Sequence, residues 1–548
     1  MSENNQAMVT SKNLTALPRS DEQTGVDFHN ANMLCEKNGR LYRMPIKQVE
    51  DTMFSDFSTL KEYGVCIDHN TKSPTLTRVG AAAGKVASYG IGAATAVNDF
   101  DNIYPYSQIK RCTLADDGTV TSYEGDVNYT EDGSIGQVMV EFPKFYYKRI
   151  YDEASNKEYN YICKEKLTGY SVWPSFADAE GNEICDKVYI APFVSNEDPE
   201  DSSMHCSIAG QELTSKYGAF LLQSKAAARG ENWHNIGLDE YAMIQYLFMI
   251  EFATTNSESI FKGINNNYIL EALANVEEYY SASTNQFAST EIAEEESTLP
   301  LTFVGQKVEI TFDLTAGTYV PSEDDIVDDD LCTTIRRITA IEPVYTNEEI
   351  DYYVLTFDGE PIPISEDDLL SQCGQYTGFL NDITAPSGVQ GESDLRIVYF
   401  KYRGLEYPFG VNYTWVNGVV MREGALYVTT DITKYGIRDE NDNKKMNIDG
   451  YSALGLMLGD KGYISKMGIS SAAPWAMLPV ECEGASDEGY CDMQDTTVNT
   501  EPTNDYVFRF GSGTDLAGGL FSSACNNPTA AATTTNRSFG RLAYRHLI

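Results

Sequence analysis

The stretch FRFGSGTDLAGGLFSSACNNPTAAATTTNRSFGRLAY, from Phe508 to Tyr544, decides the fold. Between Gly511 and Ser538, 21 of 28 residues are Gly, Ala, Ser, Thr or Asn. Such a run offers little apolar area to bury, and its composition alone is typical of a disordered linker. However, Leu520-Phe521 and the strand-like Gly540–Tyr544 bracket most of it. We therefore expect the run to be held at both ends and to form an outward-facing surface.

The hydroxyl and amide side chains of this run are candidate contacts for a binding partner, because such groups hydrogen-bond sugars or polar protein loops. Their small area predicts weak binding at one site, so that several copies would supply avidity. The candidates are Thr514, Asp515, Ser522, Ser523, Asn526, Asn527, Thr529, Thr533, Thr535 and Asn536.

Two segments upstream have the pattern of helices. Thr214–Arg229 contains good helix formers and stops at Gly230, which is a C-terminal stop signal. Leu238–Thr254 carries large apolar residues at helical spacing, and Asp239 and Glu240 fall in its first turn, where the helix dipole favours them. Both helices are interpreted as scaffold.

Strand signals dominate the rest of the chain. Val138–Phe142 precedes Pro143 and predicts a buried strand. Between residues 290 and 370, the segments Lys307–Asp313, Thr334–Glu342 and Asp351–Asp358 alternate as strands do, with the acidic loop Ser322–Asp330 among them. This part reads as an inserted small β-domain.

Several motifs in matching order resemble a known group of proteins. Tyr402–Gly410 (YRGLEYPFG), Thr414–Gly418 (TWVNG), Leu238–Asn256 and Gly136–Lys144 resemble segments of phage proteins with the C-type-lectin or formylglycine-generating-enzyme-like fold. Phe508–Tyr544 is similar to the closing segment of that group, which includes the variable proteins of diversity-generating retroelements. Here Arg541 follows Gly540 without the intervening Phe of the family pattern.

The resemblance implies an α+β fold. Its C-type-lectin-like domain would have two helices on a twisted antiparallel sheet, after a β-rich N-terminal region and around the inserted β-domain. The expected division is a flexible leader or docking arm over 1–25, a β-rich domain over 26–150, the first part of the lectin-like domain over 151–289, the acidic insert over 290–370, and the second part with the variable-like face over 371–548.

The resemblance also implies a non-catalytic virion protein, made in the host cytoplasm and placed at the tail tip or fibre. It would form a homotrimer, contact other virion proteins and bind a glycan or protein receptor on the bacterial surface. Trp415 and Glu406 would be scaffold. The enzyme branch of the fold class uses two closely spaced cysteines near its C-terminal strand, and this chain has only Cys525 there.

Charge and sequence pattern argue against a nucleic-acid-binding protein, a disulfide-rich protein and a membrane protein. The formal net charge of −41 would repel nucleic-acid phosphates; it indicates solubility or, alternatively, divalent-cation sites in the acidic loops. The 11 cysteines are scattered and predict mostly free thiols. The N-terminus does not resemble a signal peptide, and the longest apolar stretch, Tyr241–Ala253, is too short to insert into a membrane.

No motif predicts catalysis, a cofactor or a metal site. Gly80–Val86 departs from the phosphate-loop spacing, and Asp439–Asn443 lacks the glycine and the closing acid of a calcium loop. The five histidines are isolated in sequence. Two alternatives to receptor binding stay open. One is a structural virion component, such as a capsid decoration or tail assembly protein. The other, ranked last, is a glycan hydrolase, which would need two carboxylates roughly 5–10 Å apart.

Overall fold

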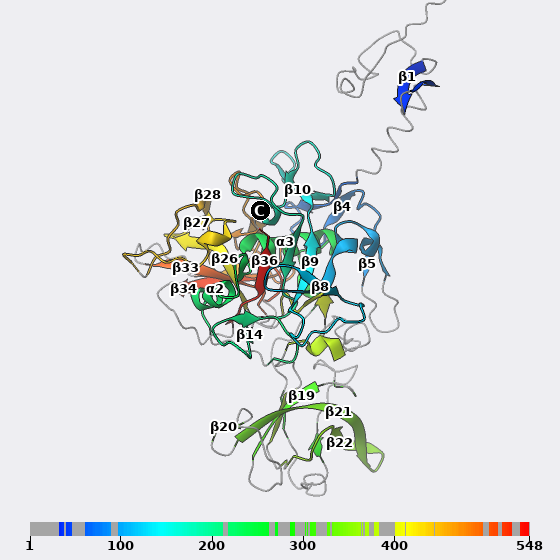
Figure 1. The fold of residues 1–548 in the computed structure, drawn as a ribbon, viewed down its shortest axis with the longest axis vertical. Helices are drawn as coiled ribbons and strands as arrows, with labels where there is room; N and C mark the ends of the chain where they lie inside the picture. The colour runs from blue at the N-terminus through cyan, green and yellow to red at the C-terminus, as the bar shows by residue number, and fades with distance from the viewer. Residues whose placement is uncertain are drawn as a thin grey trace, which may run out of the picture.

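The computed structural model describes most of the chain outside the N-terminal region and several loops. The described residues are 32–37, 40–45, 61–88, 97–194, 196–211, 217–261, 269–271, 285–290, 302, 304, 307–313, 326–328, 331–362, 364, 368–371, 377–382, 400–410, 413–442, 444–496, 504–512, 518–528 and 538–546. They form an α+β structure that is mostly β-sheet, with two α-helices in the described part (Figure 1).

Helix α3, Leu238–Phe252, lies at the centre of the main body, and all of its residues are buried. The Glu240 carboxylate accepts from the Gly237 amide at 2.7 Å, which caps the start of the helix. The helix ends at Ala253, whose φ of 52° is left-handed. The predicted helix is therefore confirmed. Helix α2, Ala219–Ala227, confirms the second one over a shorter range; residues 212–216 lie outside the described part.

The C-terminal strand lies inside a six-stranded antiparallel sheet. The strand order is β16 (Trp233–Asn235), β36 (Leu542–Arg545), β13 (Lys187–Ile190), β9 (Gln137–Pro143), β7 (Lys110–Leu114) and β8 (Val120–Tyr123). β9 confirms the predicted strand before Pro143, and all of its residues are buried. Because β36 pairs on both sides, the end of the chain is fixed between strands that are far away in sequence.

A five-stranded sheet contains segments from both sides of residue 150. Its order is β12 (Ser171–Val172), β10 (Tyr146–Asp152), β11 (Lys157–Cys163), β3 (Tyr63–Asp68) and β4 (Thr77–Gly80). β10 crosses the predicted boundary at residue 150, and β11 pairs with β3, so this sheet joins residues from both sides of that position. The side chains of β3, β9 and β10 share one core with α3.

The third sheet carries part of the run from Gly511 to Ser538, which we call the glycine-rich segment. Its order is β28 (Ser452–Met457), β27 (Ala425–Val428), β26 (Tyr413–Arg422), β33 (Asp505–Phe510), β34 (Ser523–Pro528), β32 (Met493–Thr496) and β29 (Gly462–Tyr463), and β35 (Ser538–Phe539) pairs with β26 in parallel. Helix α3 contacts β26 of this sheet and β3 and β11 of the five-stranded sheet.

The insert has a sheet and a hydrophobic core of its own, and Figure 1 shows its strands gathered in one lobe. The order is β17 (Ile269–Glu271), β23 (Leu369–Ser371), β19 (Lys307–Asp313), β21 (Leu331–Thr346), β22 (Glu349–Phe357) and β18 (Gln286–Ser289), with β20 (Ile326–Asp328) paired to β21. The three predicted strands are present. β17 and β18 precede the expected start at residue 290, so the sheet extends beyond the predicted range.

Short elements complete the described structure. The two-stranded pairs are β1 (Asn32–Lys37) with β2 (Arg40–Pro45), β5 (Ala87–Ser88) with β6 (Val97–Asn98), β14 (Asn196–Glu197) with β15 (His205–Cys206), β24 (Lys401–Tyr402) with β25 (Leu405–Glu406), and β30 (Lys466–Met467) with β31 (Pro479–Glu481). The 3-10 helices are η3 (Asp99–Asn102), η4 (Tyr106–Gln108), η5 (Pro174–Phe176), η6 (Ser257–Ser259), η8 (Phe379–Asp382) and η9 (Ile432–Lys434).

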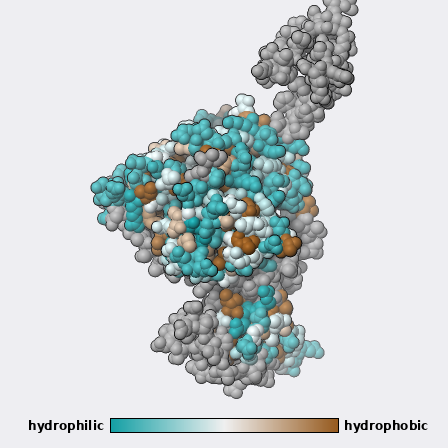
Figure 2. Space-filling view, viewed as in Figure 1, coloured by the Kyte–Doolittle hydropathy of each residue, from teal (hydrophilic) through white to brown (hydrophobic). Residues whose placement is uncertain are grey.

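The large hydrophobic side chains are mostly inside. The main core combines α3 with residues of the five-stranded sheet, the six-stranded sheet and the third sheet. Figure 2 shows a face on which hydrophilic residues cover most of the described main body and hydrophobic ones are scattered. Within the described residues, no helix is both long enough and apolar enough to cross a membrane.

Candidate binding surface at the C-terminal segment

The glycine-rich segment is anchored at Leu520, through the backbone of that residue. Its amide donates to the Ser257 hydroxyl oxygen at 2.8 Å. Its carbonyl oxygen accepts from the Tyr241 hydroxyl at 3.1 Å and from the Gln245 side-chain amide at 3.0 Å. Tyr241 and Gln245 are one turn apart on α3, and all four residues are buried. The segment is thus attached directly to the central helix.

The buried Asp492 carboxyl group holds the next residue. Its Oδ2 atom accepts from the Phe521 amide at 2.7 Å. Burial, followed by the nearby Glu258, raises the pKa of Asp492 well above its usual range. A Cβ atom added to Gly519, whose φ is 132°, would lie 2.3 Å from Oδ1 of Asp492. Glycine is therefore required for this close approach.

Ser522 and Ser523 do not lie on the expected outward surface. Both are fully buried. The Ser522 hydroxyl donates to the Gly519 carbonyl at 2.7 Å and accepts from the Ser512 amide at 2.8 Å. The Ser523 hydroxyl is hydrogen-bonded to the Gln494 side chain. Their expected exposure is therefore wrong, because small side chains here fill a tight crossing of the chain and close it with hydrogen bonds.

The other candidate contacts divide into two groups. Asn526 and Asn527 lie in β34, where Asn527 pairs with Val507 of β33; the positions of the two side chains are outside the described part. Also outside the described residues are Thr514, Asp515, Thr529, Thr533, Thr535 and Asn536. A role in binding stays a prediction for these eight residues.

The far end of the segment is held by β35. Ser538 is paired with Tyr413 of β26, and its hydroxyl accepts from Nη1 of Arg509 at 2.9 Å. The Arg509 guanidinium lies over the rings of Tyr413 and Trp415, at 4.7 and 5.3 Å from their centroids. Cation–π contacts of a buried arginine stabilise this corner of the sheet.

Arg541 is a second fixed point, three residues further on. Its guanidinium is buried and donates to four backbone carbonyl oxygens, those of Ala191 at 2.8 Å, Pro192 at 2.6 Å, and Glu406 and Tyr407 at 3.0 Å each. Burial lowers the pKa of Arg541 to about 10, which still leaves the group charged at neutral pH. One side chain therefore connects the C-terminal strand to two separate loops.

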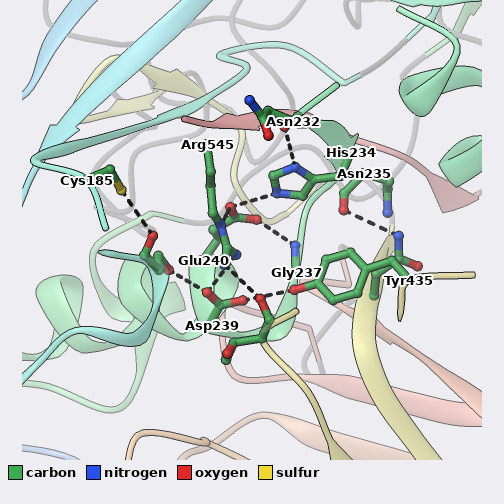
Figure 3. Close-up of polar contacts among 12 residues, drawn as sticks. Cys185, Asn232, His234, Asn235, Gly237, Asp239, Glu240, Tyr435 and Arg545 are labelled. Atoms are coloured by element: carbon green, nitrogen blue, oxygen red, sulfur yellow. Dashed lines mark hydrogen bonds and ion pairs between the residues drawn. The ribbon is translucent and has the colours of Figure 1, made fainter. Parts of the chain in front are cut away.

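Arg545 closes the arrangement at the N-terminus of α3, as Figure 3 shows. Its Nε atom donates to Oε1 of Glu240 at 2.7 Å, and its Nη2 atom forms an ion pair with Asp239 at 2.6 Å. His234 contacts the same Glu240 oxygen at 2.9 Å, and the Tyr435 hydroxyl donates to Asp239 at 3.2 Å. Each of these side chains is buried. The cluster fixes the end of the chain; all of its charges are withdrawn from solvent.

Three residues that the sequence analysis missed form the accessible part of this corner. Tyr413 is half-buried, and Lys461 forms an ion pair with Asp495 at 3.0 Å, with side chains 62% and 39% exposed. Burial raises the pKa of Tyr413; a hydrogen bond with the Ser512 side chain and then the charges of Arg509, Asp495 and Lys461 also act on it. An aromatic hydroxyl near two cations and one anion suits polar recognition. No sequence signal joined these residues, because they come from three distant segments.

The described residues contain no group of three His, Cys, Asp or Glu side chains placed to hold a metal ion. No protein-family model matches the chain, and no curated protein matches it.

Proposed function

We propose that this chain is a phage virion protein of the tail tip or fibre that attaches the particle to the bacterial host surface. The observation that carries the proposal is the anchoring of a small-residue segment at both ends. Leu520 is bound to α3, and Ser538 and Arg541 are bound to the sheets on the other side. Such a segment can change in sequence between its anchors while the scaffold stays folded.

The proposal includes a C-type-lectin-like fold for the main body. In support, the C-terminal strand β36 lies between β13 and β16, and two helices accompany antiparallel sheets. The motif TWVNG falls at the start of β26, where it contacts Arg509 and pairs with β33. A homotrimer would multiply a weak contact with a surface receptor, in agreement with the small side chains of the segment.

Competition for host adsorption tests the proposal. Purified full-length protein, added before the phage, should occupy receptors and slow adsorption of the particle. Alanine at Asn526, Asn527, Thr529, Thr533, Thr535 and Asn536 together should weaken this competition by at least about tenfold, since each lost hydrogen bond contributes about 0.5–1.5 kcal/mol. The matched control replaces Thr119 and Asn128, which are exposed and outside the segment, with alanine.

If the variant with six alanine substitutions competes as well as the unchanged protein, the binding role of the segment is refuted. If, instead, cross-linking of intact particles joins the segment to a neighbouring virion subunit, the structural alternative, a decoration or assembly protein, would replace the proposal.

A further inference from the structure

A cavity of about 420 Å³ lies on the main body, and the residues that line it are all outside the glycine-rich segment. It is lined by β10 and β12, by the loop after η5, by the end of β27 and by residues 472–475. Its volume is within the range of small-molecule sites, which runs from about 300 to 1,000 Å³. Gly450 and Ser452 also line it, so five separate segments provide walls that a single loop could not.

Two polar groups in the cavity wall have no hydrogen-bond partner in the described part of the chain. Tyr147 and Trp475 are each only 5% exposed. Among the described residues, neither the Tyr147 hydroxyl nor the Trp475 indole N–H has a hydrogen-bond partner, and neither atom is sealed from solvent. Because both donors are open to the cavity, a molecule that accepts hydrogen bonds can bind them there.

The rim indicates the chemistry of that molecule. Lys166, which is paired with Glu183 at 3.8 Å, supplies a cation, and Asp178 and Glu180 supply anions. Thr430 and Ser452 supply hydroxyl groups. Because both signs of charge are present, the rim favours neither an anionic nor a cationic ligand. Hydroxyl groups both donate and accept, so a neutral polyhydroxylated ligand can satisfy the donors of the wall and the acceptors of the rim together.

We propose that this cavity binds a neutral pyranose sugar. The Tyr147 hydroxyl and the Trp475 N–H donate to sugar oxygens, and the exposed edges of their rings contact the apolar C–H groups of the sugar. The site is independent of the glycine-rich segment and goes beyond host attachment through it. A single sugar ring offers few atoms, so the expected dissociation constant is on the order of millimolar.

Titration of the purified full-length protein with D-glucose, D-galactose and N-acetylglucosamine tests the proposal. The measurements are saturation-transfer NMR of the sugar and the change in tryptophan fluorescence. At least one of the three sugars should bind. Tyr147→Phe should weaken that binding by about two- to tenfold, as expected for one lost hydrogen bond. The phenyl ring keeps the edge contact with Trp173, whose ring centroid is 5.0 Å from that of Tyr147.

Tyr146→Phe is the matched control, because the neighbouring hydroxyl donates to Glu183 at 2.9 Å and does not line the cavity. This variant should bind like the unchanged protein. Absence of binding by all three sugars in the tens of millimolar would overturn the proposal. So would equal affinity of the Tyr147→Phe variant, or preferential binding of the anionic sugar D-galacturonate. None of these results depends on host adsorption, so the proposal can fail while the attachment function stands.

Discussion

Replacing Arg541 with methionine should cost about 3–5 kcal/mol of the free energy of unfolding. Methionine fills a similar volume but donates no hydrogen bond, so the carbonyl groups of Ala191, Pro192, Glu406 and Tyr407 all lose their charged donor. Each buried polar group left without a partner costs about 1–3 kcal/mol, and local rearrangement recovers part of the total. Urea unfolding followed by tryptophan fluorescence measures the change. The four tryptophans all lie outside the insert, residues 269–371, so the signal reports unfolding of the main body.

Arg438→Met provides the control for this prediction. Arg438 is half-buried, and its guanidinium lies 4.1 Å from the ring centroid of Phe220. Losing that exposed cation–π contact should cost about 0.5–1 kcal/mol. Equal losses in the two variants would show that the four carbonyl contacts of Arg541 do not fix the C-terminal strand.

Replacing Arg545 with methionine should have an effect of similar size, about 3–5 kcal/mol. The change leaves Asp239 and Glu240 buried side by side without the cation that faces both of them. Arg545→Lys keeps a positive charge but loses the planar fork, so its loss should be intermediate. Urea unfolding of the three proteins at pH 7 measures the order. A fully stable Arg545→Met variant would contradict the account of this cluster.

The stability of the protein at acid pH should also depend on the cluster of Arg545, Asp239 and Glu240. Arg545 and His234 overcome the effect of burial and lower the pKa of Glu240 to about 2. In the unfolded chain this carboxyl group has a pKa of about 4.3. The folded pKa is the lower of the two, so the stabilisation is complete above about pH 4.3 and is lost as the pH falls towards 2. Removal of Arg545 should reduce this part of the acid dependence.

Local patterns in the sequence predicted the regular elements well. The apolar spacing of Leu238–Thr254 and its acidic first turn identified α3, and Lys307–Asp313 matches β19 at both ends. These signals are strong because each depends on residues within a single element.

Features that depend on distant partners were not predictable. Nothing in the sequence near residue 150 indicates that β11 pairs with β3 across that position, or that β13 pairs with the C-terminal strand. Ser522 and Ser523 have the composition of an exposed turn, but Gln494 and the Ser512 amide bind them inside the protein. A small polar residue suits a solvated loop and a tight internal crossing equally well, and only its partners separate the two.

Hydrogen–deuterium exchange of the full-length protein tests the central claim most directly. The amides of Leu520 and Phe521 are bonded to Ser257 and Asp492, and that of Ala543 lies between two paired strands. Peptides that contain them should exchange as slowly as peptides from α3, because their opening requires the core to open. Exchange of residues 519–523 at the rate of an unfolded chain would show that the glycine-rich segment is not anchored, and the proposed attachment surface would lose its support.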